Sequence, residues 1–264
     1  MRVKALLNET LKQTPFPRNG ESMLQDSPSI SGNNRIYLCT PVNALVEGIY
    51  EQNIPIAEIK KHGDFGLGTF NDLDGEMVLL DGQIYRVAGD GKVSIVSEQT
   101  LTPFACVTFY KPMSHEVSQD ELTYPEFLNW LTSLMPSPNL FYAFRIEGEF
   151  AQVRTRSVPK QENFRPLVEV TKDQPEFNFK DISGTLAGFF TPAFMASLNV
   201  PGLHLHFLSQ DRQQGGHLLE CRVKKVRAEI QFLYTLELSL PVSLDYLTWD
   251  FQRDIRGDLD KAEK

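Results

Sequence analysis

The second half of the chain constrains the fold most, because it is a nearly continuous series of strand patterns with little room for helices. From residue 141 onward, stretches rich in β-branched and aromatic residues alternate with short polar or glycine-containing turns, as is typical of antiparallel and mixed sheets. We expect most of these strands to be joined as hairpins. They are predicted at 141–146, 150–157, 182–190, 203–208, 217–226 and 228–240.

The first half mixes strands with short helices. A strand is predicted over 36–39, after which Thr40 can cap a helix that has Pro41 at its first position. A second helix is predicted over 55–62, and the three glycines between 63 and 68 predict an irregular segment. Because helices and strands do not alternate one for one, the predicted fold class is α+β, with antiparallel or mixed sheets.

Two local motifs predict a turn and a helix start. Asp81-Gly82 lies between apolar strand patterns, and an Asp-Gly pair supplies the positive φ angles of a type I′ hairpin turn. Thr123 and Glu126 have the spacing of a capping box in front of a helix with one apolar face. That helix should end before the Pro-Ser-Pro stretch at 136–138, which we interpret as the boundary between two lobes.

The sequence therefore predicts two strand-rich lobes with a few short helices. Residues 1–35 are predicted to form an irregular lead-in, because most of them are small or polar. An α+β lobe is predicted over 36–136 and a β-rich lobe over 139–264. A small ligand would be enclosed in the cleft between these lobes.

Charge and composition argue against several kinds of partner. The formal net charge is −8 and the basic residues form no run, so we expect no nucleic acid partner. The N-terminus lacks the apolar stretch of a secretory signal and no later segment is long enough to cross a bilayer, so we expect no membrane association. Three widely separated cysteines predict neither a disulfide framework nor a Cys-rich metal site, and they fit a cytoplasmic protein.

Three of the five histidines lie within one short segment. His204 and His206 are two residues apart on a predicted strand, so their side chains point to the same face. The polar stretch that follows ends in Gly215-Gly216, which would let the chain reverse and bring His217 beside the pair. Three neutral imidazoles hold zinc with one position left open, as in catalytic sites; iron, nickel or cobalt would also fit.

A second interpretation of these histidines stays open. Alternating histidines also occur as packed or exposed polar residues on a half-buried strand, with no ligand. The third histidine after the two glycines strengthens the case for a metal site, and the two interpretations then stand about equal.

Four stretches of the chain, in the same order, resemble the acetolactate decarboxylase family. They are HGDFGLGTFN at 62–71, LDGE at 73–76, RTRSVPKQ at 154–161 and the histidine segment from 203 to 217. The resemblance spans most of the chain. It implies a carboxy-lyase in acetoin and butanediol metabolism that converts (S)-2-acetolactate to (R)-acetoin and carbon dioxide.

The resemblance also implies a cofactor and a chemistry. The metal would be zinc or another divalent transition metal on the three histidines, and no organic cofactor is expected. Loss of carbon dioxide from a β-keto acid leaves electrons that must flow into the ketone, and a cation on that oxygen stabilises the resulting enediolate.

Residue roles follow from the matching motifs. Arg156 matches the active-site arginine of the family, although Ser157 follows it where threonine is more usual, and its guanidinium suits a carboxylate. Glu76 matches an acid/base residue that protonates the enediolate. Thr69 is expected to touch substrate, and Glu263 is the candidate for a glutamate that the family brings into the site from near the C-terminus.

Without the resemblance, plainer interpretations would be preferred for two of these residues. Arg154 and Arg156 alternate on a strand and would be taken as a solvated face, and Glu76 would be taken as an exposed strand end.

Alternative functions are a metal hydrolase or iron-dependent oxygenase with the same histidines, or a non-enzymatic metal-binding or sensing module. We expect the protein to form a homodimer.

Overall fold

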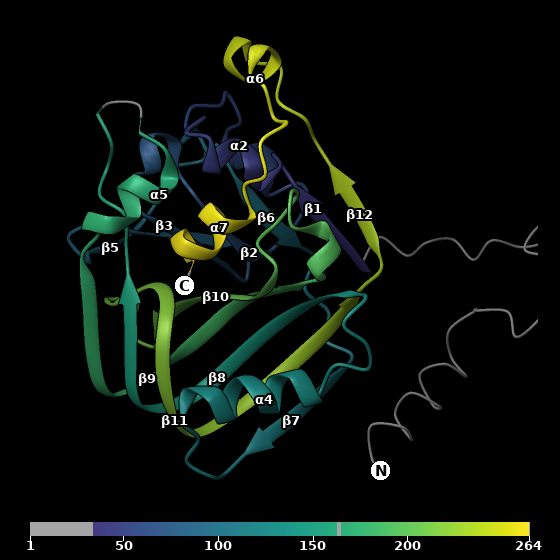
Figure 1. Cartoon of the computed structure of the whole chain (residues 1–264). Coiled ribbons are helices and arrows are strands. Elements are labelled where there is room, and N and C mark those ends of the chain that lie inside the picture. The colour runs from purple at the N-terminus through teal and green to yellow at the C-terminus, as the bar shows by residue number, and fades with distance from the viewer. Residues whose placement is uncertain (1–33, 163–164, 264) are drawn as a thin grey trace, which may run out of the picture.

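The protein is described by a computed structural model that covers residues 34–162 and 165–263. It contains two β-sheets, with short helices packed around them (Figure 1). The α+β class predicted from sequence is confirmed, with mixed pairing in one sheet and antiparallel pairing in the other. Most of the predicted lead-in over residues 1–35 lies outside the described residues.

The first sheet has seven strands in the order β12-β1-β6-β2-β3-β4-β5. Strands β1 and β12 pair in parallel, and the other pairs in this sheet are antiparallel. The strands are β1 Arg35–Leu38, β2 Phe65–Thr69, β3 Glu76–Leu80, β4 Gln83–Val87, β5 Val93–Ile95, β6 Ala105–Thr108 and β12 Thr235–Leu238.

The second sheet is built from long antiparallel strands in the order β10-β9-β8-β11-β7. Strand β10 also pairs with the start of β11, so β10, β9, β8 and β11 close into a ring. The strands are β7 Ser114–Ser118, β8 Phe141–Arg156, β9 Glu176–Thr191, β10 Gly202–Ser209 and β11 Gly215–Leu233.

The helices are short. None of those in the described part of the chain is long and apolar enough to cross a membrane. The α-helices are α2 Val42–Val46, α3 Ile56–Ile59, α4 Tyr124–Ser133, α5 Leu167–Val170, α6 Leu244–Thr248 and α7 Arg256–Glu263, and the 3-10 turns are η2 Asn71–Leu73, η3 Thr171–Asp173 and η4 Ala193–Met195.

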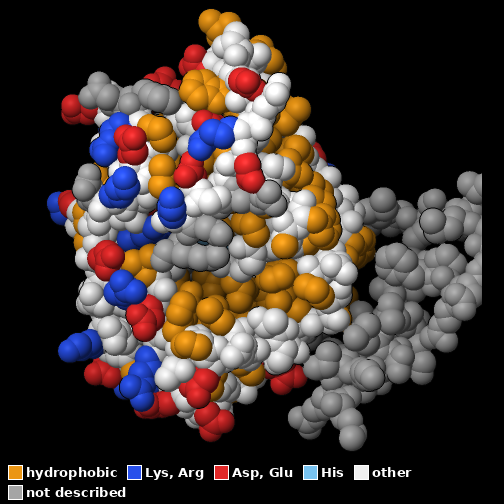
Figure 2. Space-filling view, viewed as in Figure 1, with side chains coloured by type: hydrophobic (Ala, Val, Ile, Leu, Met, Phe, Trp, Pro, Cys, Tyr) orange, Lys and Arg blue, Asp and Glu red, His pale blue; other side chains and the backbone are white. Residues whose placement is uncertain are grey.

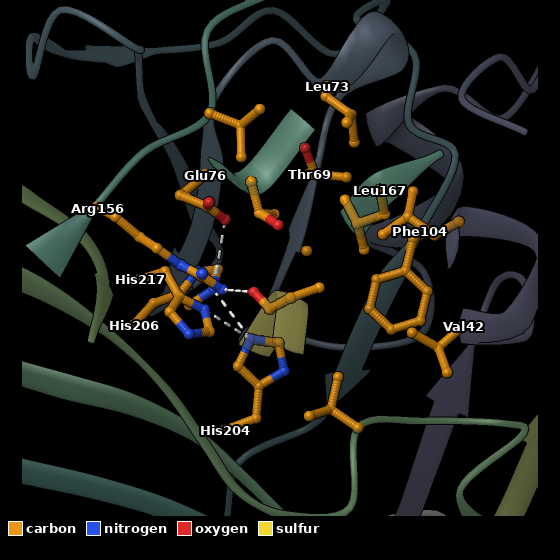
Figure 3. A pocket seen from close by; sticks show the side chains of 16 residues that line it. Val42, Thr69, Leu73, Glu76, Phe104, Arg156, Leu167, His204, His206 and His217 are labelled. Atoms are coloured by element: carbon orange, nitrogen blue, oxygen red, sulfur yellow. Dashed lines mark hydrogen bonds and ion pairs between the residues drawn. The ribbon is translucent and has the colours of Figure 1, made fainter. Parts of the chain in front are cut away.

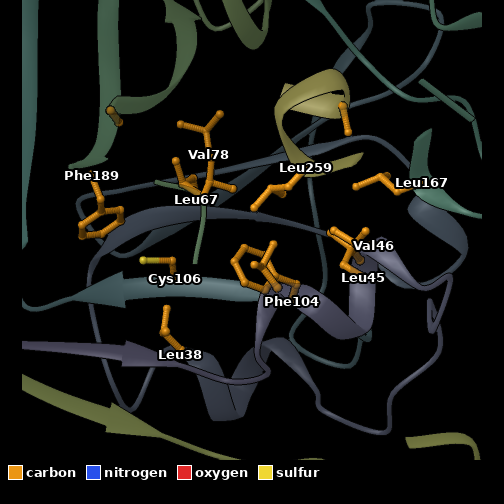
Figure 4. Close-up of a cluster of buried hydrophobic side chains, with 14 of the residues drawn as sticks. Leu38, Leu45, Val46, Leu67, Val78, Phe104, Cys106, Leu167, Phe189 and Leu259 are labelled. Carbon is orange, nitrogen blue, oxygen red and sulfur yellow. The ribbon is translucent and has the colours of Figure 1, made fainter. Parts of the chain in front are cut away.

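Three apolar clusters form the core. One covers a face of the first sheet together with α3, and another packs α4 onto the closed ring of the second sheet. The third joins the other face of the first sheet to α2, α5 and α7 and includes Phe189 of β9 (Figure 4). The two faces of β3 illustrate the division: Met77 and Leu79 enter one cluster, and Val78 and Leu80 enter another.

Both motif-based predictions of local structure are confirmed. Strands β3 and β4 pair as a hairpin around Asp81 and Gly82, whose φ angles are 52° and 75°. Helix α4 begins with the capping box of Thr123 and Glu126, in which the Thr123 backbone N–H donates to the Glu126 carboxylate at 2.8 Å.

The hairpins predicted at 141–157 and 217–240 are wrong. The first is a single 16-residue strand, β8, and the second is β11 followed by β12, which joins the other sheet. Gly148 lies between the two predicted strands 141–146 and 150–157, and a Cβ there would lie 2.1 Å from the Lys225 carbonyl oxygen. The glycine thus permits close pairing of β8 with β11 instead of ending the strand.

Two predictions in the first half are also corrected. Pro41, not Thr40, is the N-cap of α2, and the Thr40 hydroxyl donates to the Cys39 carbonyl. The segment with three glycines contains the regular strand β2. A Cβ on Gly66 or Gly68 would lie within 2.3 Å of a carbonyl oxygen of the β6 segment, so these two glycines allow close strand contact.

The chain passes between the sheets more than once. Strand β7 and helix α4 precede residue 139 yet pack on the second sheet, and β12 returns to the first. The division into lobes over 36–136 and 139–264 stays a prediction, because sheet membership alone does not define independent folding units.

Candidate metal centre

The three histidines meet where β10 and β11 pair. His204 and His206 lie on one face of β10, and His217 is the register partner of His206 on β11. The alternate residues of β10, Leu203 and Leu205, point to the opposite face, where they pack with the core cluster. Strand alternation therefore directs the imidazoles together, as the sequence predicts.

The reversal that brings His217 back differs in detail from the prediction. The turn is made by 210–214, and the hydroxyl of Ser209, the last residue of β10, accepts from the backbone N–H of Gln214 at 3.0 Å. Gly215 and Gly216 already belong to β11. A Cβ on Gly216 would lie 2.5 Å from the Arg156 carbonyl oxygen, so this glycine lets β11 approach β8.

The imidazole nitrogens converge on one point (Figure 3). His204 Nε2 lies 3.2 Å from His206 Nε2 and 3.2 Å from His217 Nδ1. One nitrogen from each ring lies within 4.8 Å of the others, and all three residues are buried. The donor set and its spacing fit a transition-metal ion.

Burial keeps two of the rings neutral. Burial, with a smaller contribution from the Arg156 guanidinium, lowers the pKa of His204 to about 3. Burial and the neighbouring His204 also hold the pKa of His206 well below its usual value. Only the neutral imidazole has a lone pair for a metal, so these rings are ready to bind an ion at neutral pH.

A backbone carbonyl orients His206. Its Nδ1 lies 2.8 Å from the Met77 carbonyl oxygen of β3, in the other sheet. Since a carbonyl only accepts, Nδ1 carries the proton and Nε2 presents its lone pair to the centre. Sequence reasoning missed this contact, because a carbonyl leaves no mark in the residue pattern.

Glu76 is brought to the histidines by the same strand. It is the first residue of β3 and is buried, and its carboxylate lies 3.5 Å from His206 Nε2. The alternation of β3 turns Glu76 to the same side as Val78, toward the space between the sheets. Glu76 is thus not the exposed strand end that the local sequence alone would favour.

Arg156 and Arg154 have separate environments. Arg154 is 36% exposed in its side chain and pairs with Glu176 and Glu220 on the surface. Arg156 is buried, and its Nη2 donates to the Ala262 carbonyl of α7. In β11 its register partner is His217, so Arg156, His217 and His206 form a row across three strands.

Thr69 also lines the cavity and is buried. Its hydroxyl donates to the Gly75 carbonyl at 2.8 Å. The hydroxyl proton is thus already used, and the group can only accept a further hydrogen bond.

Helix α7 carries the C-terminal segment to the site. Ala262 lines the cavity, and its carbonyl accepts from Arg156. The backbone of Glu263 ends this helix, but its side chain lies outside the described residues. Most of the remaining wall is apolar and comes from residues that sequence reasoning missed, since they resemble ordinary core residues: Val42, Leu45, Leu73, Phe104, Val158, Leu167 and Val200.

Comparisons with known proteins agree on one family. The sequence model described as alpha-acetolactate decarboxylase matches residues 36–253. The alpha-acetolactate decarboxylase of Methanosarcina mazei is 38% identical over 249 residues, which is 93% of this chain and 86% of that protein. The Bacillus subtilis enzyme of that name is 39% identical over 229 residues, covering 84% of this chain and 89% of that one.

Solved structures give the same result. The crystal structure of alpha-acetolactate decarboxylase from Bacillus subtilis superposes with a TM-score of 0.85 at 36% identity, over 87% of this chain and 99% of that chain. A Staphylococcus aureus protein described as similar to alpha-acetolactate decarboxylase has a TM-score of 0.83 at 29% identity, over 87% of this chain and 100% of that chain. By sequence and by fold, the chain belongs to the alpha-acetolactate decarboxylase family of carboxy-lyases.

Proposed function

We propose that the protein converts (S)-2-acetolactate to (R)-acetoin and carbon dioxide at the three-histidine centre, with zinc as its metal. One observation carries the proposal: a pocket lined by buried polar side chains brings the histidine nitrogens together with the Glu76 carboxylate and the Arg156 guanidinium. Family membership supplies the reaction class. No organic cofactor is required.

His204, His206 and His217 would hold the metal. A divalent cation there supplies Lewis acidity toward the ketone oxygen of the substrate, which takes up the electrons of the breaking C–C bond. Zinc is proposed over iron, nickel or cobalt because three neutral imidazoles with an open fourth position are its common catalytic arrangement.

Arg156 binds the substrate anion in this proposal. Its Nε is buried and has no hydrogen-bond partner among the described residues, although an unpaired buried N–H is costly. A substrate carboxylate would satisfy it with a charge-assisted hydrogen bond. The Ala262 carbonyl holds the other end of the guanidinium in position.

In this proposal Glu76 supplies the proton that replaces the lost carboxylate. When carbon dioxide leaves, the electron pair of the broken C–C bond remains as an enediolate, and a proton must be added to that carbon. Glu76, which lies beside His206, would deliver it from one face only. Delivery from one face gives a single product enantiomer, for which we propose (R)-acetoin.

Two further contacts belong to the proposal. The Thr69 hydroxyl would accept a hydrogen bond from the hydroxyl group of the substrate, because its own proton is given to Gly75. Glu263 would join the site from the end of α7, whose preceding residue already lines the cavity.

The test is acetoin formation from racemic acetolactate by purified protein, before and after chelation and after addition of zinc. Acetoin should form, stop on chelation and return with zinc. Glu76→Gln should keep its metal while kcat falls at least about a hundredfold, and the surface variant Glu98→Gln, 58% exposed in its side chain, serves as the control. If folded, metal-loaded protein makes no acetoin, the hydrolase, oxygenase and binding-module alternatives become preferred.

We also propose a cytoplasmic homodimer. All three cysteines are free and buried, which fits a reducing compartment.

A surface that could form the dimer lies near the C-terminus. Strand β12 is an edge strand, and the segment after it exposes Val242, Leu244 and Leu247 by 66–85%. Figure 2 shows hydrophobic side chains at the projection that Figure 1 labels α6. Sedimentation should give twice the chain mass of 30.0 kDa, and a monomer would refute the dimer.

A further inference from the structure

Helix α7 closes one side of the histidine cavity, so its position affects the site. Ala262 lines the cavity, and Leu259 lies in the apolar cluster with Leu45, Val46 and Leu167 (Figure 4). Because Arg156 donates to the Ala262 carbonyl, a shift of α7 would also release the guanidinium.

Helix α7 depends on contacts with the body of the protein to stay in place. It has eight residues, and isolated helices of that length are marginal in water. Three apolar residues at its start and along its length, Ile255, Leu259 and Ala262, are buried against the body of the protein. The segment before it, from α6 to 254, is mostly exposed.

One cation links the start of α7 to the body. Arg253 donates to the Glu47 carboxylate from Nε at 2.9 Å, and its Nη2 lies 2.8 Å from the same oxygen. Its Nη1 lies 2.5 Å from the carboxylate of Asp258, in the first turn of α7. We refer to Glu47, Arg253 and Asp258 as the tail clasp.

The burial of Glu47 gives the tail clasp its importance. Glu47 is the C-cap residue of α2, and its side chain is only 10% exposed. Removal of the Arg253 side chain would take away the cation that the structure pairs with both this carboxylate and that of Asp258. The cost of a largely buried carboxylate that has lost this partner would then disfavour the docked helix.

We propose that Glu47 and Arg253 are positioning residues of the metal centre: they hold α7, and with it the Ala262 carbonyl, against the cavity. Neither touches the site. Their effect on turnover rests on the proposed function, whereas their effect on the helix does not.

Hydrogen exchange of the C-terminal peptide of metal-free, full-length protein tests directly whether the tail clasp keeps α7 docked. Arg253→Ala should speed exchange of the α7 amides about tenfold, because exchange follows the open population. Arg253→Lys keeps the cation and should restore most of the protection. Arg35→Ala is the matched control. Arg35 pairs with Glu237 at 2.6 Å, and this pair joins β1 to β12 instead of holding α7. Equal exchange in Arg253→Ala and wild type would overturn the proposal.

Turnover provides the second readout. In zinc-loaded Arg253→Ala, kcat/KM should fall about tenfold with metal content unchanged, and Arg253→Lys should recover it. Faster exchange with unchanged kcat/KM would show that the clasp holds the helix without positioning the site, which would also overturn the proposal. If wild-type protein itself makes no acetoin, the proposed function fails, and the exchange comparison still tests the clasp.

Discussion

Neutral buried histidines make this centre sensitive to acid. The pKa of His204 is lowered to about 3 and that of His206 is well below its usual value, in both cases chiefly by burial. Unfolding exposes both rings to water, where their pKa returns to about 6.5. The folded and unfolded chains therefore bind different numbers of protons below that pH.

For metal-free protein this predicts a loss of stability on acidification. Below about pH 6.5 the unfolded chain takes up protons that the folded chain does not, so the free energy of unfolding falls as pH falls, by up to about 1.4 kcal/mol per pH unit for each histidine. Urea unfolding between pH 7 and pH 5 measures this slope. His204→Gln should reduce the slope, and an identical slope in that variant would contradict the account.

The two arginines at the end of β8 provide a matched comparison. Arg156→Ala should leave metal bound and lower kcat/KM at least about a hundredfold, because it removes the group that positions the substrate carboxylate. Arg154→Ala removes a surface cation two residues away and should change turnover less than about threefold. Similar losses in both variants would remove Arg156 from its proposed role.

At the residue scale, the local sequence pattern was enough to predict where only some of the site side chains lie. The His-X-His alternation predicts that two imidazoles share a face, because strand geometry is local. Glu76 and Arg156 could be assigned only through resemblance, since their burial depends on two sheets meeting at the site. The tail clasp joins residues 47 and 253, and no local pattern connects positions that far apart.

At the element scale, turns and caps were predictable, whereas strand continuity was not. Asp81-Gly82 and the Thr123 capping box act within a few residues of the chain and were predicted correctly. Glycines misled the prediction at two places where they serve close packing, Gly148 in β8 and Gly68 in β2. From one sequence, a glycine that permits contact cannot be told from one that makes a turn.

Two glycines distinguish these uses experimentally. A Cβ on Gly68 would lie 2.3 Å from the Phe104 carbonyl oxygen, so Gly68→Ala should lower the free energy of unfolding by about 3 kcal/mol. Gly82 has a φ of 75°, and a Cβ added there would meet no atom within 4 Å, so Gly82→Ala should cost about 1 kcal/mol. Urea unfolding of both variants checks the order, and a larger cost at Gly82 would contradict it.

At the scale of the whole molecule, the centre is assembled from distant parts of the chain. Strand β3 supplies Glu76 and the Met77 carbonyl, β10 and β11 supply the histidines, β8 supplies Arg156, and α7 closes the side. The two sheets must therefore dock before the site exists. This docking explains why the fold class could be predicted from sequence while the apolar residues that line the cavity could not.

The most direct test of the central claim measures bound metal and acetoin formation in the same preparations of wild type and His206→Ala. His206 joins the other two histidines and contacts β3. The account predicts about one zinc per chain and steady acetoin formation in wild type, and loss of both in folded His206→Ala. Wild-type rates of acetoin formation in a metal-free His206→Ala variant would contradict it.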